Sequence, residues 1–184
     1  LTYDIAHNPA APSAPREWLR QTLLPQVTKN LSEQKIETFF YGNFNSDRTR
    51  WTTFGHEPRY SSEYMGLRGR LAILSEAYSY LPYRDRIAAH SQFITETLKV
   101  AALHHPLISK LLKQATASPS QRQSVRAKNG PYAEKVTILG YRKKATEDSE
   151  EGVEPQDYRL THYANFETTL EVNRPFAYLM PKEH

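Results

Sequence analysis

The sequence of 184 residues contains no cysteine, only two methionines and no long hydrophobic run. The lack of cysteine excludes disulfide bonds and thiolate metal sites. No apolar segment approaches the roughly 20 residues that a membrane-spanning helix needs. Positive charges exceed negative charges by only four, and the basic clusters are short, so the chain lacks the concentrated basic stripe of a nucleic-acid groove. We therefore expect neither a nucleic acid nor a membrane as a partner.

Aromatic residues, in contrast, are plentiful: the chain has 12 Tyr, 7 Phe and 2 Trp. This composition favours a folded chain with tyrosine-lined surfaces over a disordered one. The length is that of one sizeable domain, or of one domain with a small appendage. Because the sequence begins at Leu1, without an initiator methionine or a signal peptide, we expect it to be part of a longer product.

Hydrophobic periodicity predicts alternating strands and helices in the first two thirds of the chain. Strands are expected over residues 1–5, 36–41 and 71–74. A helix with one buried stripe is predicted by residues that recur at every fourth position: Leu19, Leu23, Val27 and Leu31. Pro25 lies inside that helix and should kink it. A later helix should begin near Tyr83. Its inner face is predicted to consist of Ile87, Ile94, Leu98 and Ala101.

A change of pattern at residues 118–121 divides the sequence. Residues 1–117 are predicted to form an α/β domain, because strand and helix patterns alternate there. From residue 121 to residue 184, short alternating runs separated by turns predict a small antiparallel β appendage. The charged segment 143–155 is interpreted as a mobile loop between two of its strands.

One carboxylate stands out by its position. Glu76 follows the short apolar run 71–74, and the aromatic residues Tyr78 and Tyr80 come directly after it. Ligands of open α/β sheets bind beyond the carboxyl ends of the strands. An acid placed there beside aromatic walls has a raised pKa and can act as a general acid or base. The plainer interpretation is a surface glutamate at the end of a strand.

Four segments in a fixed order carry a family resemblance. They are residues 39–44 (FFYGNF), 58–60 (PRY), 66–68 (GLR) and 74–80 (LSEAYSY). Together they resemble the C-terminal half of a bacterial-type zinc carboxypeptidase of the carboxypeptidase A family, and the likeness covers about the first 110 residues. The resemblance implies the C-terminal part of an α/β domain with a mixed, mainly parallel sheet. It also implies that Glu76 promotes the attack of zinc-bound water on a peptide carbonyl.

The resemblance suggests further substrate-binding residues. In the family a tyrosine on a mobile loop closes over the bound C-terminus, and both Tyr60 and Tyr64 are candidates for that role. Arg68 is our candidate for binding the terminal carboxylate, because a guanidinium binds a carboxylate through two hydrogen bonds. The family's own carboxylate-binding pair lies upstream of this sequence. The alternative is that these are structural aromatics and solvated arginines.

Zinc ligands are expected outside this chain. None of its seven histidines is followed at the third position by glutamate, so the His-x-x-Glu motif of the family is absent. The third family ligand precedes a strand that residues 1–3 match, which places all three ligands before Leu1. The adjacent pair His104 and His105 points to different helix faces and is a poor shared ligand. His90, near the apolar face of its helix, is expected to be a packed core histidine.

Two functions remain open on the sequence. The first is a fragment of a zinc metallocarboxypeptidase that releases C-terminal residues from peptides. Its partners would be peptide C-termini and the missing N-terminal half of the domain. That missing half would cover a sheet edge that is otherwise exposed. The resemblance suggests an extracytoplasmic or secreted location. The second is a non-catalytic module that holds a peptide or a carbohydrate between the tyrosines Tyr60, Tyr64, Tyr78 and Tyr80.

The first prediction concerns zinc. Because the ligands are expected upstream of Leu1, the 184-residue chain should keep no tightly bound zinc after dialysis and should hydrolyse no peptide on its own. Metal analysis of the dialysed protein measures this directly. Stoichiometric retention of zinc would show that the ligands lie within the chain.

Overall fold

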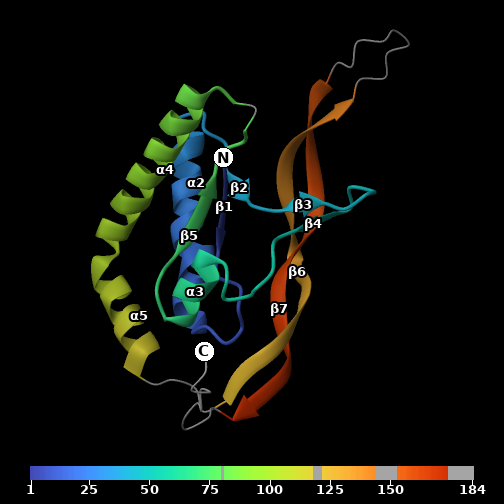
Figure 1. Cartoon of the computed structure of the whole chain (residues 1–184). Helices are drawn as coiled ribbons and strands as arrows, with labels where there is room; N and C mark the ends of the chain where they lie inside the picture. Colours follow the sequence, from blue (N-terminus) through green and yellow to red (C-terminus); the bar gives the residue numbers. More distant parts are fainter. Residues whose placement is uncertain (80, 118–121, 144–152, 174–184) are drawn as a thin grey trace, which may run out of the picture.

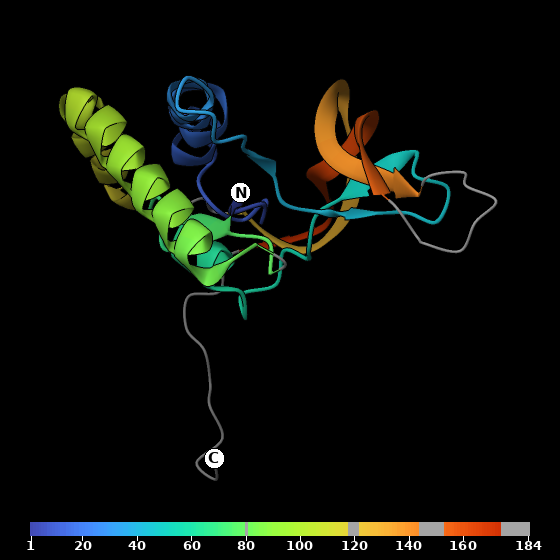
Figure 2. The ribbon, with the colours of Figure 1, turned by 90° about the horizontal axis from the view of Figure 1, so that it is seen from above.

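The structure, a computed structural model, describes residues 1–79, 81–117, 122–143 and 153–173. Tyr80, the predicted boundary at 118–121 and the greater part of the charged segment, residues 144–152, lie outside the described residues. A helical layer, a small central sheet and a long twisted hairpin follow one another across the molecule (Figures 1 and 2).

The central sheet has three described strands in the order β2–β1–β5: β1 (Thr2–Ile5), β2 (Phe39–Phe40) and β5 (Ile73–Glu76). The predicted mixed α/β fold is confirmed. The sheet is not mainly parallel, however, because β1 pairs in parallel with β2 but antiparallel with β5. The reason is the path of the chain: helix α3 (Ser61–Leu67) packs near the C-terminal end of β1, so β5 starts at that end and runs back along β1.

The two faces of β1 contact different layers. The side chains of Tyr3 and Ile5 belong to the main hydrophobic core beneath the helices. Asp4, between them, is fully buried and is hydrogen-bonded to Thr53 on the other side of the sheet. This alternation places one apolar and one polar cluster on opposite faces of the same strand.

The first helical stretch contains a break at its centre. It consists of α1 (Ser13–Trp18), the π-helical segment η1 (Leu19–Leu23) and α2 (Leu24–Ser32). The predicted stripe is confirmed, since Leu19, Leu23, Val27 and Leu31 are all buried. Pro25 lacks the N–H that an α-helix would bond to the carbonyl of Gln21. The predicted kink therefore takes the form of a π-helical turn just before the proline.

The later helices cover the central sheet together with α2. They are α4 (Tyr83–Leu103) and α5 (His105–Ala117). The predicted inner face of α4 was wrong, because Ile87, Ile94 and Leu98 are 51%, 54% and 63% exposed. Among the described helices, none is long and apolar enough to cross a membrane.

A different face of α4 is buried. Phe93 stacks on Tyr3 at 6.0 Å between ring centroids, and Val100 joins the same core. Glu96 lies on this face too, where it accepts hydrogen bonds from Asn30 and Gln34 of the α2 region and from Lys99. The inner face of α4 thus contains a buried, hydrogen-bonded glutamate, whereas Ile87 and Ile94, which hydropathy predicts to be inside, are exposed. Of the predicted inner residues, Ala101 does pack against the core.

The second sheet joins the C-terminal hairpin to two short strands. Its order is β3–β4–β7–β6, with β3 (Asn43–Phe44), β4 (Arg50–Thr52), β6 (Arg122–Lys143) and β7 (Val153–Asn173). The predicted antiparallel pairing is present between β6 and β7, which form two long strands. β4 pairs in parallel with β7. The hairpin therefore shares a sheet with residues 50–52 and a second core of Trp51, Ile138 and Leu160.

A glycine on α3 allows the close approach of this helix to β1. A Cβ atom added at Gly66 would collide with the Cβ atom of Ala6, just after β1. We expect Gly66→Ala to lower the free energy of unfolding by about 1–3 kcal/mol, the usual cost of overpacking. Urea denaturation measures it. The matched control is Gly130→Ala, where an added Cβ meets only ordinary contacts, and equal effects of the two substitutions would contradict this account of Gly66.

Candidate functional site

A groove of about 700 Å³ follows β5 on the surface. One wall is α3 with its C-cap residue, from which Tyr64, Met65 and Arg68 line the groove. The other wall is the segment 70–75, which leads into β5 and includes most of it. Tyr64 and Met65 are 49% and 46% exposed, so two large apolar side chains face solvent beside the strand. Exposed apolar surface next to a strand is typical of a binding site.

The opposite face of α3 is buried and anchors the helix. The carboxylate of Glu63 is fully buried and accepts hydrogen bonds from the backbone N–H of His7 at 2.8 and 2.9 Å. It also accepts the backbone N–H of Asn8 at 2.8 Å. Burial raises the pKa of Glu63, and the backbone hydrogen bond from His7 opposes that rise. These bonds hold the loop after β1 to α3 and fix the wall of the groove.

A carboxylate and a histidine are paired beneath the same loop. Asp4 Oδ1 lies 2.8 Å from His7 Nε2, and both side chains are buried. Asp4 also accepts the backbone N–H of Ile5 at 2.9 Å and the hydroxyl of Thr53. A carboxylate that orients a histidine in this way occurs in catalytic triads and in metal sites. Within the described residues, however, no three His, Cys, Asp or Glu side chains come together to hold a metal ion.

A second buried histidine lies between the helical layer and the hairpin. His162 of β7 is fully buried, and its Nδ1 lies 3.4 Å from Nη2 of Arg20. The guanidinium of Arg20 is stacked between the rings of Tyr132 and Phe40, at 3.7 and 4.4 Å from their centroids. Burial, and then the charge of Arg20, lower the pKa of His162 to about 4. His162 is therefore neutral near pH 7.

The hydrogen-bond geometry defines the tautomer of His162. A guanidinium only donates hydrogen bonds, so Nδ1 of His162 is the acceptor and Nε2 carries the proton. Among the described residues, neither His162 Nε2 nor Arg20 Nη1 has a hydrogen-bond partner, although both atoms are buried. The guanidinium of Arg20 already places one positive charge in this buried contact between the helical layer and the hairpin. A second positive charge on His162 would repel it and weaken the contact.

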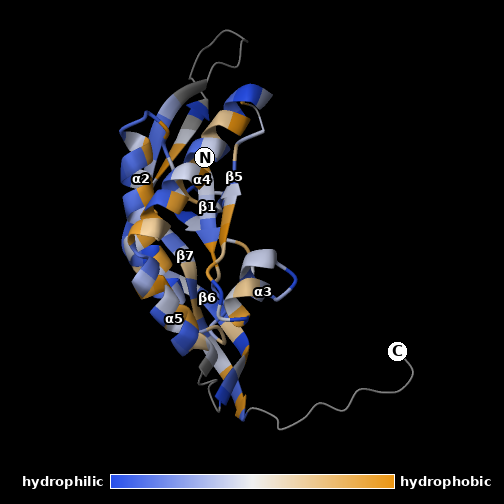
Figure 3. Cartoon of the chain, turned by 90° about the vertical axis from the view of Figure 1, so that its left-hand side faces the viewer, coloured by the Kyte–Doolittle hydropathy of each residue, from blue (hydrophilic) through white to orange (hydrophobic). Residues whose placement is uncertain are grey.

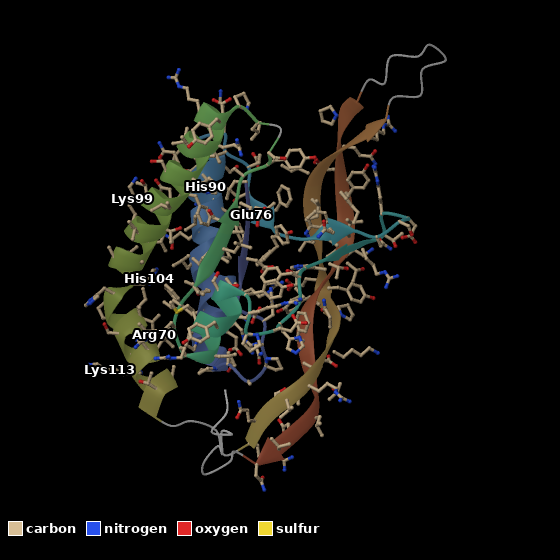
Figure 4. All side chains as sticks on the ribbon, in the orientation of Figure 1. Arg70, Glu76, His90, Lys99, His104 and Lys113 are labelled. Atoms are coloured by element: carbon tan, nitrogen blue, oxygen red, sulfur yellow. The ribbon has the colours of Figure 1, made fainter. Side chains whose placement is uncertain are left out.

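The predicted site residues fall in different places. Tyr64 and Arg68 both line the groove, with Arg68 Nη1 at 3.2 Å from the Tyr64 hydroxyl. Tyr60 instead packs against Phe54, at 4.8 Å between ring centroids. Glu76 is exposed at the end of β5 opposite Thr2, and Figure 4 shows it at the other end of the strand from Arg70.

Glu76 is consequently separated from the buried histidine of β1. It lies beside the start of β1, whereas His7 follows the end of that strand. His90, predicted to be a core residue, is half-buried, and its Nδ1 is 2.7 Å from the Ser75 hydroxyl. Tyr80 lies outside the described residues.

Sequence reasoning missed the buried polar residues of this region. Asp4 did carry a signal, because a charged residue between the apolar Tyr3 and Ile5 of a short strand must find a buried partner. Glu63, Arg20 and His162 gave no such signal, since each reads as an ordinary polar residue in its local pattern.

Comparisons with known proteins do not assign this chain to a family. No family model, no curated protein and no solved structure matches this chain. The described residues also do not fit a zinc site on their own, because the Asp4 and His7 pair has no third ligand among them. The zinc role that the resemblance implies stays a prediction about a longer protein.

The depressed pKa of His162 predicts acid sensitivity. The unfolded chain, with an ordinary pKa of 6.5, binds this proton more readily than the folded protein, with a pKa of about 4. The stability is fully present above pH 6.5 and is lost as the pH falls toward 4. By pH 5, His162 should have removed about 2 kcal/mol from the free energy of unfolding.

Urea denaturation of wild type and of His162→Gln between pH 7 and pH 5 tests this effect. The variant should lose less stability on acidification than wild type. Glu63 contributes to both proteins and cancels in the difference. His105→Gln, at an exposed helix start, is the control and should behave as wild type. Parallel pH profiles of wild type and His162→Gln would show that His162 does not titrate as described.

Proposed function

We propose that this protein binds an extended peptide along the outer edge of β5, with a peptide carboxylate held by Arg68 and Arg70. The observation that carries the proposal is a strand that lies, among the described residues, at the edge of its sheet and also lines a groove of about 700 Å³. An exposed edge offers main-chain donors and acceptors to an added strand, and adjacent pockets take alternate side chains.

The pairing pattern shows which backbone groups face outward. The carbonyls of Leu1 and Tyr3 accept N–H groups of the β2 region, so Thr2 and Asp4, the alternate residues of β1, turn their backbone groups toward β5. The register pairs Thr2 with Glu76 and Asp4 with Leu74. The N–H and C=O groups of the intervening residues, Ile73 and Ser75, therefore point away from β1 to the open edge.

The chemistry of the groove favours a peptide over a carbohydrate. A sugar site usually stacks its ligand on aromatic rings, but among the described tyrosines Tyr64 is the one that lines this groove. Arg68 and Arg70 are exposed at the same groove and supply two guanidinium groups. A guanidinium binds a carboxylate through charge-assisted hydrogen bonds. Figure 3 shows hydrophobic colouring along β5, which suits the apolar side chains of an added strand.

Hydrolysis is not part of this proposal. The role of Glu76 as a general base requires a zinc ion, and the described residues do not supply its ligands. Peptide C-termini would be the partner in either case, because the metallocarboxypeptidase resemblance and the groove both indicate a peptide. The activity of a longer protein therefore remains a separate prediction.

Peptide binding can be measured by fluorescence anisotropy with a labelled β-prone peptide that has a free C-terminus. We expect Arg68→Ala to weaken binding by about 10-fold or more, the cost of losing one charge-assisted hydrogen bond. Amidation of the peptide terminus should weaken binding to a similar degree. Arg84→Ala, an exposed arginine at the start of α4, is the control and should leave binding unchanged.

Two further comparisons test the mode of binding. If Arg68 binds the terminal carboxylate, Arg68→Ala should have little additional effect on the amidated peptide. If the peptide adds a strand, N-methylation of alternate amides should abolish binding, because those groups bond to the edge. Unchanged binding of the methylated peptide would rule out strand addition. If Arg68→Ala weakened the binding of the free and the amidated peptide equally, Arg68 would not bind the terminal carboxylate.

A further inference from the structure

We infer that two copies of this chain pair through their β5 edges, antiparallel and about a two-fold axis at Ile73. The proposal goes beyond peptide binding, because a second copy would occupy the edge in the absence of any peptide. An antiparallel pair with a two-fold axis is self-complementary, so one strand can be its own partner. Three independent features of the edge fit this occupant.

The first feature is the direction of the backbone groups. Ile73 turns its N–H and C=O to the open edge, as derived above from the register with β1. With the axis at Ile73, the two copies of this residue form a hydrogen-bonded pair. Residues 70–72 precede β5, and an extension of the pairing into them would make Ser75 of one copy and Leu71 of the other the next such pair. An axis at Leu74 would also satisfy the outward backbone groups, through pairs of Ile73 with Ser75, but it would place Arg70 opposite Tyr78 instead of Glu76.

The second feature is charge. Arg70 and Glu76 lie equally far from Ile73 in the sequence, so antiparallel pairing places Arg70 of each copy opposite Glu76 of the other. Both side chains are exposed; Glu76 ends β5, and Arg70 precedes the first residue of β5 by three positions, as Figure 4 shows by their separation. With the pairing extended to residue 70, both would occupy non-hydrogen-bonded positions, where facing side chains come closest. Opposite charges in such pairs stabilise a sheet, and like charges destabilise it.

The third feature is the apolar surface at each end of the strand. Tyr64 and Met65 are exposed near the Arg70 end, at 49% and 46%. Tyr78 and Leu81 are exposed just after the Glu76 end, at 64% and 45%. Antiparallel pairing brings the first end of one copy to the second end of the other. The interface would therefore cover apolar surface at both ends as well as the two charge pairs.

Sedimentation equilibrium over a concentration series, without peptide, tests the dimer. Wild type should be in a monomer–dimer equilibrium. Arg70→Glu and Glu76→Arg should each weaken dimerisation by at least about 10-fold, because each creates two like-charge pairs across the axis. The double variant R70E/E76R restores opposite charges and should recover the dimer. Lys113→Glu, an exposed lysine on α5, changes the net charge by the same amount as Arg70→Glu and should have no effect.

Each other outcome would overturn the proposal. A wild-type protein that is monomeric throughout the series has no such interface. Loss of the dimer in both single variants without recovery in the double variant would mean a different partner surface, and loss in Lys113→Glu would mean a general charge effect. Peptide binding is measured separately, so a monomer that still binds peptide would leave the proposed function standing and remove only the dimer.

Discussion

The groove depends on one buried carboxylate. Glu63 accepts the backbone N–H groups of both His7 and Asn8, and it thereby ties α3 to the loop that follows β1. Burial of this charge is costly, and the hydrogen bonds offset that cost. Because α3 is held at this end of β1, the chain that leaves it can only run back along β1. The same contact is consistent with the antiparallel direction of β5.

A second polar contact joins the layers on the other side of the sheet. Arg20, from the π-helical turn before Pro25, is stacked between rings of β2 and β6 and faces His162 of β7. This contact requires a neutral histidine, since a guanidinium already provides the positive charge. We therefore expect the packing of the hairpin to depend on pH.

Two candidate occupants, an extended peptide and a second copy of the chain, would use the same backbone groups at the open edge of β5. Its outward backbone groups, at Ile73 and Ser75, could pair with any extended chain that supplies complementary groups. In the two proposals above, Arg68 and Arg70 would select for a carboxylate, either at the end of a peptide or, for Arg70, on Glu76 of a second copy. If both bind, they compete, and the concentration of the protein itself would regulate access to the groove.

The sequence by itself determined the elements that local periodicity defines. The stripe from Leu19 to Leu31, the disturbance at Pro25 and the antiparallel nature of the C-terminal hairpin were all predicted, because each follows from spacing within one segment. The direction of β5 and the buried face of α4 were decided only by the tertiary structure. Glu96 is inside because Asn30 and Gln34, distant in sequence, bond to it, and such partners cannot be read from a local pattern.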